Sequence, residues 1–152
     1  MKISSMRLIN VALVSAVTVS WSMALFVTPA SAQAATLYDE LGQQGGISKI
    51  VDETVTLVLA DERIKTSFKD TNIKRFSKLL KEQFCVVAGG PCEYSGDEMK
   101  IVHEKLGVTS AHFNALAEDL QLAMEKCNIP FSVQNKFIAK LAPMKRDIVT
   151  GK

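Results

Sequence analysis

Apolar residues recur at helical spacing along this chain from residue 36 to residue 149, and no stretch alternates with the two-residue period of a strand. Glycine, proline and asparagine interrupt the pattern and limit the length of each helix. The clearest interruptions are Gly45-Gly46, Gly89-Gly90-Pro91 and Asn128-Ile129-Pro130. The sequence therefore predicts an all-α fold in which separate helices close one modest core.

The apolar stripes define the expected helices. They are 36–41, 47–60, 73–87, 96–106, a long helix that begins at Thr109 and Ser110, and 132–149, with a short turn region over 61–68. Asp70, Thr71 and Asn72 offer N-cap side chains for the helix over 73–87. We expect Pro143 to kink the last helix or to mark its final turns, because proline lacks the backbone N–H that a helix interior uses.

The first 32 residues have the composition of a signal peptide. Lys2 and Arg7 give a positive start, residues 8–27 are largely apolar, and Ala30-Ser31-Ala32 supplies the small residues of a cleavage site. We expect cleavage after Ala32, which leaves residues 33–152 as one periplasmic or secreted domain. An uncleaved membrane anchor is the alternative, because the apolar run is long.

Charge argues against a nucleic-acid partner. The whole chain has 18 Lys and Arg against 16 Asp and Glu, and two of the basic residues, Lys2 and Arg7, fall in the signal peptide. The domain itself is therefore balanced in charge and lacks the basic footprint of a nucleic-acid binder. After cleavage we also expect no association with a membrane.

Cys85, Cys92 and Cys127 are the cysteines of the chain. Export places them in an oxidising compartment, where thiols that lie close together tend to pair. Cys85 and Cys92 flank the Gly89-Gly90-Pro91 turn, so chain reversal is able to bring them within bonding distance. We favour this disulfide. The alternative is that each cysteine is a small buried hydrophobe.

The segment from Gly89 to Val108 carries the clearest functional pattern. After the Gly-Gly-Pro break, a Tyr94-Ser95-Gly96 turn leads into a short helical segment that contains His103 and is closed by Gly107. A single imidazole on a short helix, beside apolar neighbours, is what an axial haem-iron ligand needs. From these residues alone, a structural histidine is the commoner interpretation.

This segment resembles the truncated globins, in which a Gly-Gly pair, a Tyr-x-Gly and a Met-x-x-x-His recur in this order. The resemblance extends from about Thr36 to Val149 and rests also on residues 37–42, 58–64 and 142–149. It implies a two-over-two helical sandwich around a haem. The glycine-rich breaks resemble those of group I, the group with an internal ligand tunnel.

By this resemblance His103 is the proximal haem ligand, with Nε2 on the iron and Nδ1 donating to a backbone carbonyl. The haem is expected to be non-covalent haem b, since the chain has no Cys-x-x-Cys-His motif. We expect His112, the other histidine, to be a surface residue. The expected haem contacts are Phe68, Phe76, Leu79, Leu80, Met99, Val102, Leu106, Phe113 and Leu116.

The expected distal side departs from the family. Group I relatives usually carry a tyrosine in the second helix and glutamine or histidine along the distal helix. Gln83, one turn further, is the remaining polar candidate for this pocket, and Lys78 and Lys81 are better interpreted as solvated charges than as iron ligands. The matching distal positions here are Val55, Phe76, Leu79 and Leu80, all apolar. Because a lost charge-assisted hydrogen bond costs about 1.5–3 kcal/mol, we predict weak dioxygen binding and relatively favoured carbon monoxide and nitric oxide.

Three functions follow from these expectations. The first is reversible binding of diatomic gases (O2, NO, CO) by a periplasmic haem protein, as a monomer or weak dimer. The second is a haem redox or electron-transfer protein, or an enzyme acting on nitric oxide or peroxide, with a redox partner protein. An apolar distal side offers no acid–base residue for peroxide chemistry, which weakens the second. The third is a haem-free helical interaction module.

Overall fold

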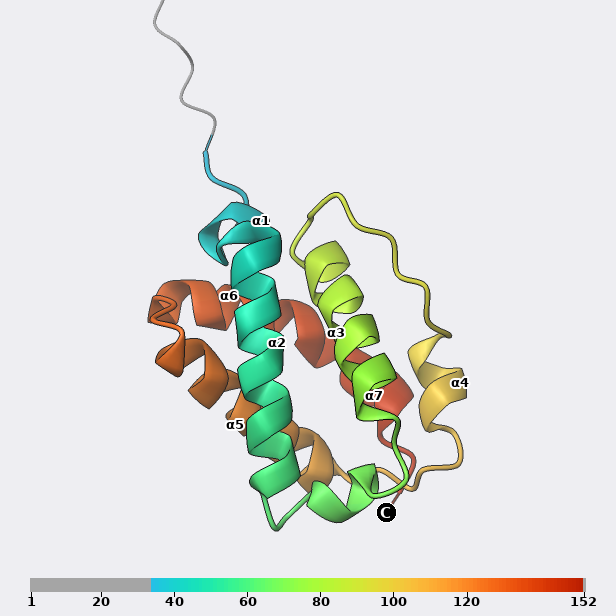
Figure 1. Cartoon of the computed structure of the whole chain (residues 1–152). Coiled ribbons are helices and arrows are strands. Elements are labelled where there is room, and N and C mark those ends of the chain that lie inside the picture. Colours follow the sequence, from blue (N-terminus) through green and yellow to red (C-terminus); the bar gives the residue numbers. More distant parts are fainter. Residues whose placement is uncertain (1–33, 152) are drawn as a thin grey trace, which may run out of the picture. The chain divides into compact units, whose positions relative to one another are not determined.

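The computed structural model describes residues 34–151, and every regular element among them is helical, as predicted. The predicted signal peptide, residues 1–32, lies outside the described residues. The elements, shown in Figure 1, are α1 (Leu37–Glu40), α2 (Gln43–Ala60), the 3₁₀ turn η1 (Lys65–Phe68), α3 (Ile73–Val87), α4 (Met99–His103), α5 (Ser110–Lys126), α6 (Phe131–Leu141), the 3₁₀ turn η2 (Ala142–Met144) and α7 (Lys145–Ile148).

Helix α2 begins earlier than predicted, because Gly45 and Gly46 lie inside its first turns instead of ahead of it. Gly42 precedes the helix with φ +81°, a backbone conformation that glycine adopts without strain. Gly46 packs directly against the chain before the helix: a Cβ here would lie 2.0 Å from the carbonyl oxygen of Leu41. Gly46 is therefore required by a close backbone approach.

Helix α3 has the predicted bounds, and the Asn72 side chain caps it by accepting from the backbone N–H of Arg75. Helix α4 is shorter than the predicted 96–106. The chain over 91–98 is irregular, and the Tyr94 ring covers Gly96 so closely that a Cβ on Gly96 would meet it. After His103 a single turn leads to Gly107, whose φ of +62° ends the segment.

The predicted final helix over 132–149 is three pieces. Helix α6 ends at Leu141, Pro143 lies inside η2, and α7 follows as a separate short helix. Because Pro143 has no N–H to donate back, the chain tightens into a 3₁₀ turn at this point.

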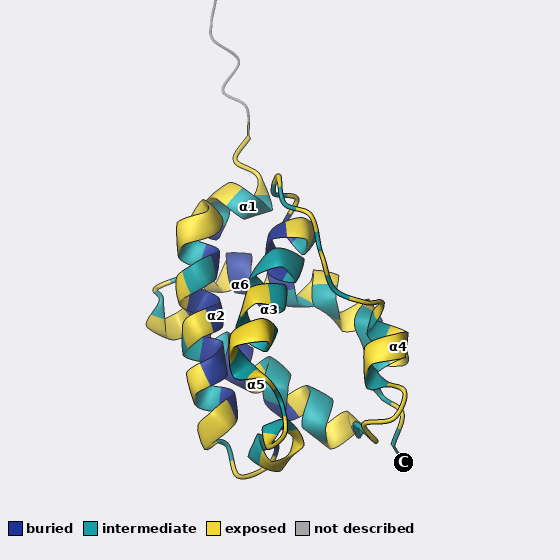
Figure 2. Ribbon diagram, turned by 45° about the vertical axis from the view of Figure 1, so that its right-hand side comes forward, coloured by how far each residue is buried: buried dark blue, intermediate teal, exposed yellow. Residues whose placement is uncertain are grey.

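The core lies where α2 packs against α3 on one side and α5 on the other, with α6 across the end. The Phe84 and Phe137 rings meet edge-on at 4.9 Å and join α3 to α6. Burial follows the inner faces of these helices, whereas α4 lies at the edge of the molecule and has no buried residue (Figure 2). The pairs α2/α3 and α5/α6 form a two-over-two sandwich, and α4 is attached beside it through α7.

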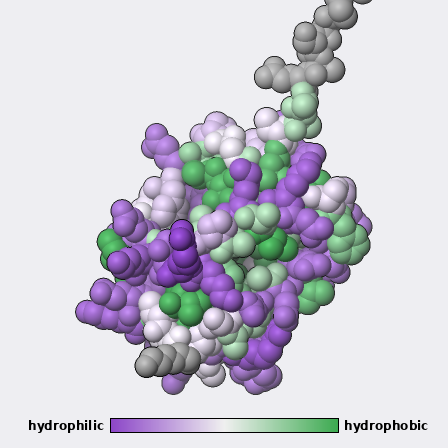
Figure 3. Space-filling view, turned by 180° about the vertical axis from the view of Figure 1, so that it is seen from behind, coloured by the Kyte–Doolittle hydropathy of each residue, from purple (hydrophilic) through white to green (hydrophobic). Residues whose placement is uncertain are grey.

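Seen from the opposite side, apolar side chains form small patches separated by hydrophilic ones (Figure 3). Among residues 34–151, no helix combines the length and the apolar character that a membrane crossing needs.

Candidate functional site

His103 is the last residue of α4, and its imidazole is fixed by its own helix. The ring Nδ1 lies 2.7 Å from the carbonyl oxygen of Met99, one turn earlier. A carbonyl oxygen only accepts, so Nδ1 carries the proton and donates. In this tautomer Nε2 keeps its lone pair, and within residues 34–151 it makes no hydrogen bond. The imidazole is therefore oriented at one nitrogen and free to ligate a metal at the other.

Apolar side chains around His103 lie uncovered. Val102 and Leu106 are 42% and 61% exposed, while Met99 is half-buried. Two exposed apolar side chains beside an available imidazole nitrogen are what a flat, largely apolar group would cover. The imidazole and the exposed apolar side chains near it in the chain thus fit a haem, and contact of Met99, Val102 and Leu106 with that haem stays a prediction.

The predicted distal residues lie on α2 and α3. Val55 and Leu80 belong to one buried apolar cluster, and Phe76 packs against it. The Phe68 and Phe76 rings lie 5.2 Å apart, which connects this cluster to a smaller one that includes Leu116. None of these side chains offers a hydrogen-bond donor, and their place on the distal side of a haem stays a prediction.

Gln83, on α3, contacts two methionine side chains. Its Nε2 lies 3.2 Å from the Met99 Sδ and 3.6 Å from the Met144 Sδ, where α3, α4 and η2 converge. These three residues line a cavity of about 440 Å³ together with Tyr94, whose pKa is raised by burial. The Gln83 amide therefore joins α3 to α4, the helix of His103, and its role in a distal pocket stays a prediction.

The remaining candidates have surface or capping roles. Lys78 pairs with Glu82 at 3.3 Å and Lys81 with Asp52 at 2.6 Å, as expected of solvated charges. His112 caps α5: its Nδ1 accepts from the Thr109 backbone N–H, and its own N–H donates to the Thr109 hydroxyl. This capping box was not predicted, although a polar side chain three residues after Thr109 indicates it.

Phe113 is half-buried and lies beneath the Lys145 ammonium, 5.5 Å from its ring centre. This contact joins α5 to α7, which in turn packs on α4. Leu79 is half-buried on α3, beside Leu80.

Comparison with known proteins gives a consistent result. The family described as bacterial-like globin matches residues 36–150. The group 1 truncated hemoglobin GlbN of Mycolicibacterium paratuberculosis is 32% identical over 120 residues, which cover 79% of this chain and 88% of that protein. This chain belongs to the truncated haemoglobins.

Solved truncated haemoglobins have the same architecture. The Fe(III) form of the Tetrahymena pyriformis protein superposes with a TM-score of 0.74 at 28% identity, covering 78% of this chain and all of that one. The 2/2 hemoglobin from Synechococcus, described with covalently attached heme, gives 0.71 at 26% identity and covers 76% and 98% of the two chains. The fold is the two-over-two globin fold, and the family implies a haem cofactor.

Proposed function

We propose that this truncated haemoglobin binds haem b non-covalently through His103 and reversibly binds diatomic gases, with dioxygen held weakly. The observation that carries the proposal is the imidazole of His103, fixed at Nδ1 and available at Nε2 beside uncovered apolar side chains. His103 would hold the haem, which would supply an iron able to bind a diatomic gas.

The chain contributes two things on the proximal side. The Met99 carbonyl accepts a hydrogen bond from the Nδ1–H of His103. This bond fixes the ring plane and increases the electron density at Nε2. Val102 and Leu106 offer apolar surface that excludes water from the imidazole once the haem covers it.

On the predicted distal side, the side chains of this chain include no hydrogen-bond donor at Val55 or Leu80. Iron-bound dioxygen has superoxide character and gains from a donor, whereas carbon monoxide gains much less. Val55 and Leu80 supply none, so the missing interaction of about 1.5–3 kcal/mol lowers dioxygen affinity roughly 10- to 150-fold. We therefore propose that carbon monoxide and nitric oxide are bound in preference to dioxygen.

Two further features support the proposal. The chain has no Cys-x-x-Cys-His motif and its other histidine is engaged in capping α5, which supports non-covalent haem. The predicted signal peptide over residues 1–32 supports a periplasmic location.

Haem titration of two histidine variants tests the assignment. His103→Ala should lose stoichiometric haem binding, while the matched variant His112→Ala should keep one haem per chain and lose only about 0.5–1.5 kcal/mol of folding stability, because its Nδ1 no longer accepts from the Thr109 backbone N–H. Absorbance at the Soret band during titration gives the stoichiometry. A His103→Ala chain with an unchanged spectrum would refute His103 as the ligand.

A further inference from the structure

We propose that the Cys85–Cys92 disulfide is a reducible tether: a dithiol reductant opens it at Cys92, and its opening loosens α4 and the hold of His103 on the haem. The link to haem rests on the proposed function above. The tether itself rests on the contacts between α3 and the segment that leads into α4.

Three contacts from about one turn of α3, residues 82–85, hold the segment over residues 91–99, named here the tether segment. Cys85 is joined to Cys92, with 5.9 Å between their Cα atoms. The Glu82 carboxylate accepts from both the backbone N–H and the hydroxyl of Ser95, at 3.0 and 2.7 Å. The third contact is between the Gln83 amide and the Met99 Sδ at the start of α4. The tether segment has no helix of its own before Met99, so these contacts fix its path.

Helix α4 has few other attachments. It is five residues long with none buried, and it packs on α7. The Thr150 hydroxyl donates to the His103 carbonyl at 3.1 Å from the C-terminal side. Because so short a helix is not stable by itself, the position of His103 depends on the tether segment at one end and on α7 and Thr150 at the other.

The two sulfurs differ in accessibility. Cys85 is 0% exposed on α3, and Gly90 covers it so closely that a Cβ there would lie 2.6 Å from its sulfur. Cys92 is half-buried in the irregular segment. An incoming thiolate therefore reaches the Cys92 Sγ, and the Cys85 sulfur is the leaving group.

The exchange balances as a two-electron reduction. A thiolate of the reductant forms a bond to the Cys92 Sγ, the Cys85–Cys92 bond breaks, and Cys85 leaves as a thiolate that takes a proton. The second thiol of the reductant, as a thiolate, then attacks the reductant sulfur that is bonded to Cys92. This closes the disulfide of the reductant and releases Cys92 as a thiolate, which takes a proton. The protein gains two electrons and two protons, and the reductant leaves as a disulfide.

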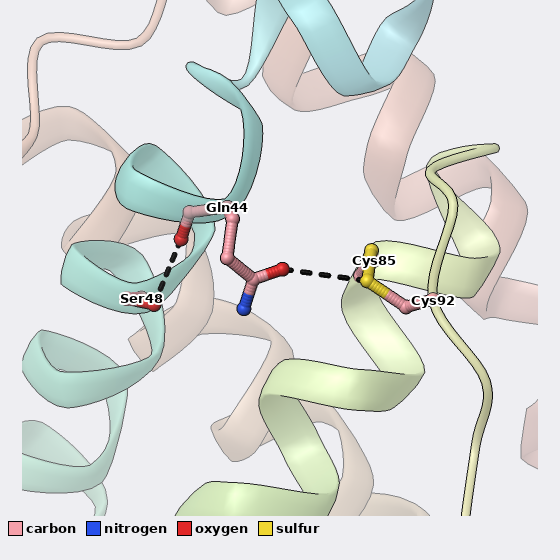
Figure 4. The surroundings of a disulfide bond; sticks show 4 residues. All are labelled: Gln44, Ser48, Cys85 and Cys92. Carbon is pink, nitrogen blue, oxygen red and sulfur yellow. Dashed lines mark hydrogen bonds between the residues drawn. A yellow bond between two sulfur atoms is a disulfide. The ribbon is translucent and has the colours of Figure 1, made fainter.

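Gln44 on α2 offers an acceptor for the opened form. Its Oε1 lies 3.3 Å from the Cys92 Sγ, and its backbone carbonyl accepts from the Ser48 hydroxyl (Figure 4). A disulfide sulfur has no proton, so in the closed form this is a contact only. After reduction the Cys92 thiol is able to donate to Gln44, which leaves the opened form with a partner at this position.

The experiment uses the full mature chain, oxidised or treated with dithiothreitol, and reads amide hydrogen exchange by mass spectrometry. Reduction should increase exchange about tenfold or more over residues 92–106 and leave α2 and α5 unchanged. Reduction of the disulfide should also make haem transfer to an apomyoglobin scavenger about tenfold faster. Cys92→Ser should reproduce both effects without reductant. Cys127→Ser is the matched control with the disulfide intact and should reproduce neither.

A third readout tests the attacked sulfur. Brief treatment with glutathione, followed by acid quench and peptide mapping, should place the adduct on Cys92. An adduct found mainly on Cys85 would overturn the assignment, and so would a disulfide that dithiothreitol leaves intact in the folded chain.

The exchange readout needs no haem, which separates this proposal from the proposed function. Unchanged exchange over 92–106 after reduction would overturn the tether, whatever the haem does. Unchanged haem binding in His103→Ala would overturn the proposed function and, with it, the control of haem release by the tether.

Discussion

Helix α2 buries six of its residues against its neighbours, whereas α4, which carries His103, buries none. The first region is held by apolar contacts that are complete within the polypeptide. The second is held by a disulfide, a few hydrogen bonds and contact with α7, and it leaves apolar side chains uncovered beside His103. The difference indicates that the sandwich folds as a scaffold, while the His103 region is completed by the group that it binds.

The largest effect should come from breaking the scaffold itself. Phe137→Ala removes a ring that is 1% exposed and meets Phe84 edge-on, so it should cost about 3–5 kcal/mol of unfolding free energy. Ile101→Ala on α4 removes a side chain that is 63% exposed and should change stability by about 0.5 kcal/mol or less. Urea unfolding of the two apo variants measures both. Equal losses would contradict the division between scaffold and α4.

A donor placed on the scaffold should alter gas chemistry without altering α4. Val55→Tyr, or the smaller change Leu80→Gln, should slow dioxygen dissociation roughly 10- to 150-fold by hydrogen bonding to the bound gas. Leu122→Gln, at an exposed position on α5, is the control and should leave the rate unchanged. Stopped-flow displacement by carbon monoxide gives the rates. Unchanged rates in both distal variants would place Val55 and Leu80 away from the gas.

Alanine substitutions at two neighbouring glycines of α2 should have opposite effects on stability, because Gly46 is needed for packing and Gly45 is not. Gly46→Ala forces a methyl group onto the Leu41 carbonyl and should cost about 1–3 kcal/mol. Gly45→Ala meets nothing within 4 Å and should gain about 0.5–1 kcal/mol, because alanine is the better helix former. Thermal unfolding distinguishes the two. A gain in both variants would mean that the close approach at Gly46 is absent.

The smallest effect should come from Asp119 on α5, which is 4% exposed and whose Oδ2 has no hydrogen-bond partner within residues 34–151. Burial raises the pKa of this carboxyl, Asp61 and Glu118 add to the rise, and Arg63 opposes it. The folded chain therefore holds this proton more tightly than the unfolded chain. The corresponding stability is present below the ordinary pKa of aspartate and is lost as pH rises through the raised value.

Asp119→Asn should make the free energy of unfolding depend less on pH over the range in which Asp119 loses its proton. Urea unfolding of both chains at a series of pH values from acid to neutral gives the slopes. A variant whose stability falls with pH as steeply as the parent chain would show that Asp119 is not the group responsible.

The positions of most helices were predictable because they depend on the spacing of apolar residues and on capping residues close by in the sequence. Apolar spacing predicted α3 within its observed bounds, and Asn72 caps it as expected. The predicted start of α2 was wrong because Gly45-Gly46 was interpreted as a helix break from its low helix propensity. Gly46 instead lies inside the helix, where only a residue without a side chain fits against the Leu41 carbonyl. The final helix was predicted over 132–149 with a kink or its last turns at Pro143, and the structure breaks it at that residue, which lies in η2.

For the site, the sequence and the family resemblance placed His103 on a short helix and predicted an apolar distal side. The contacts of Gln83 and Ser95 were not predictable, because they depend on how α3 approaches an irregular segment that has no periodicity to interpret. The Cys85–Cys92 pairing was expected from the turn between the two cysteines, and the structure joins them. Peptide mapping of the mature chain under non-reducing conditions should show a peptide that links Cys85 to Cys92.

The most direct measurement is the optical spectrum of the mature chain with haem, ferric and then dithionite-reduced, before and after carbon monoxide. We predict a five-coordinate ferrous spectrum that converts sharply to a six-coordinate one on adding carbon monoxide, because the proposed function has His103 as the protein ligand and only apolar side chains at the predicted distal positions. A six-coordinate ferrous spectrum before any gas is added would contradict an open distal side. A chain that retains no haem would contradict the proposed function as a whole.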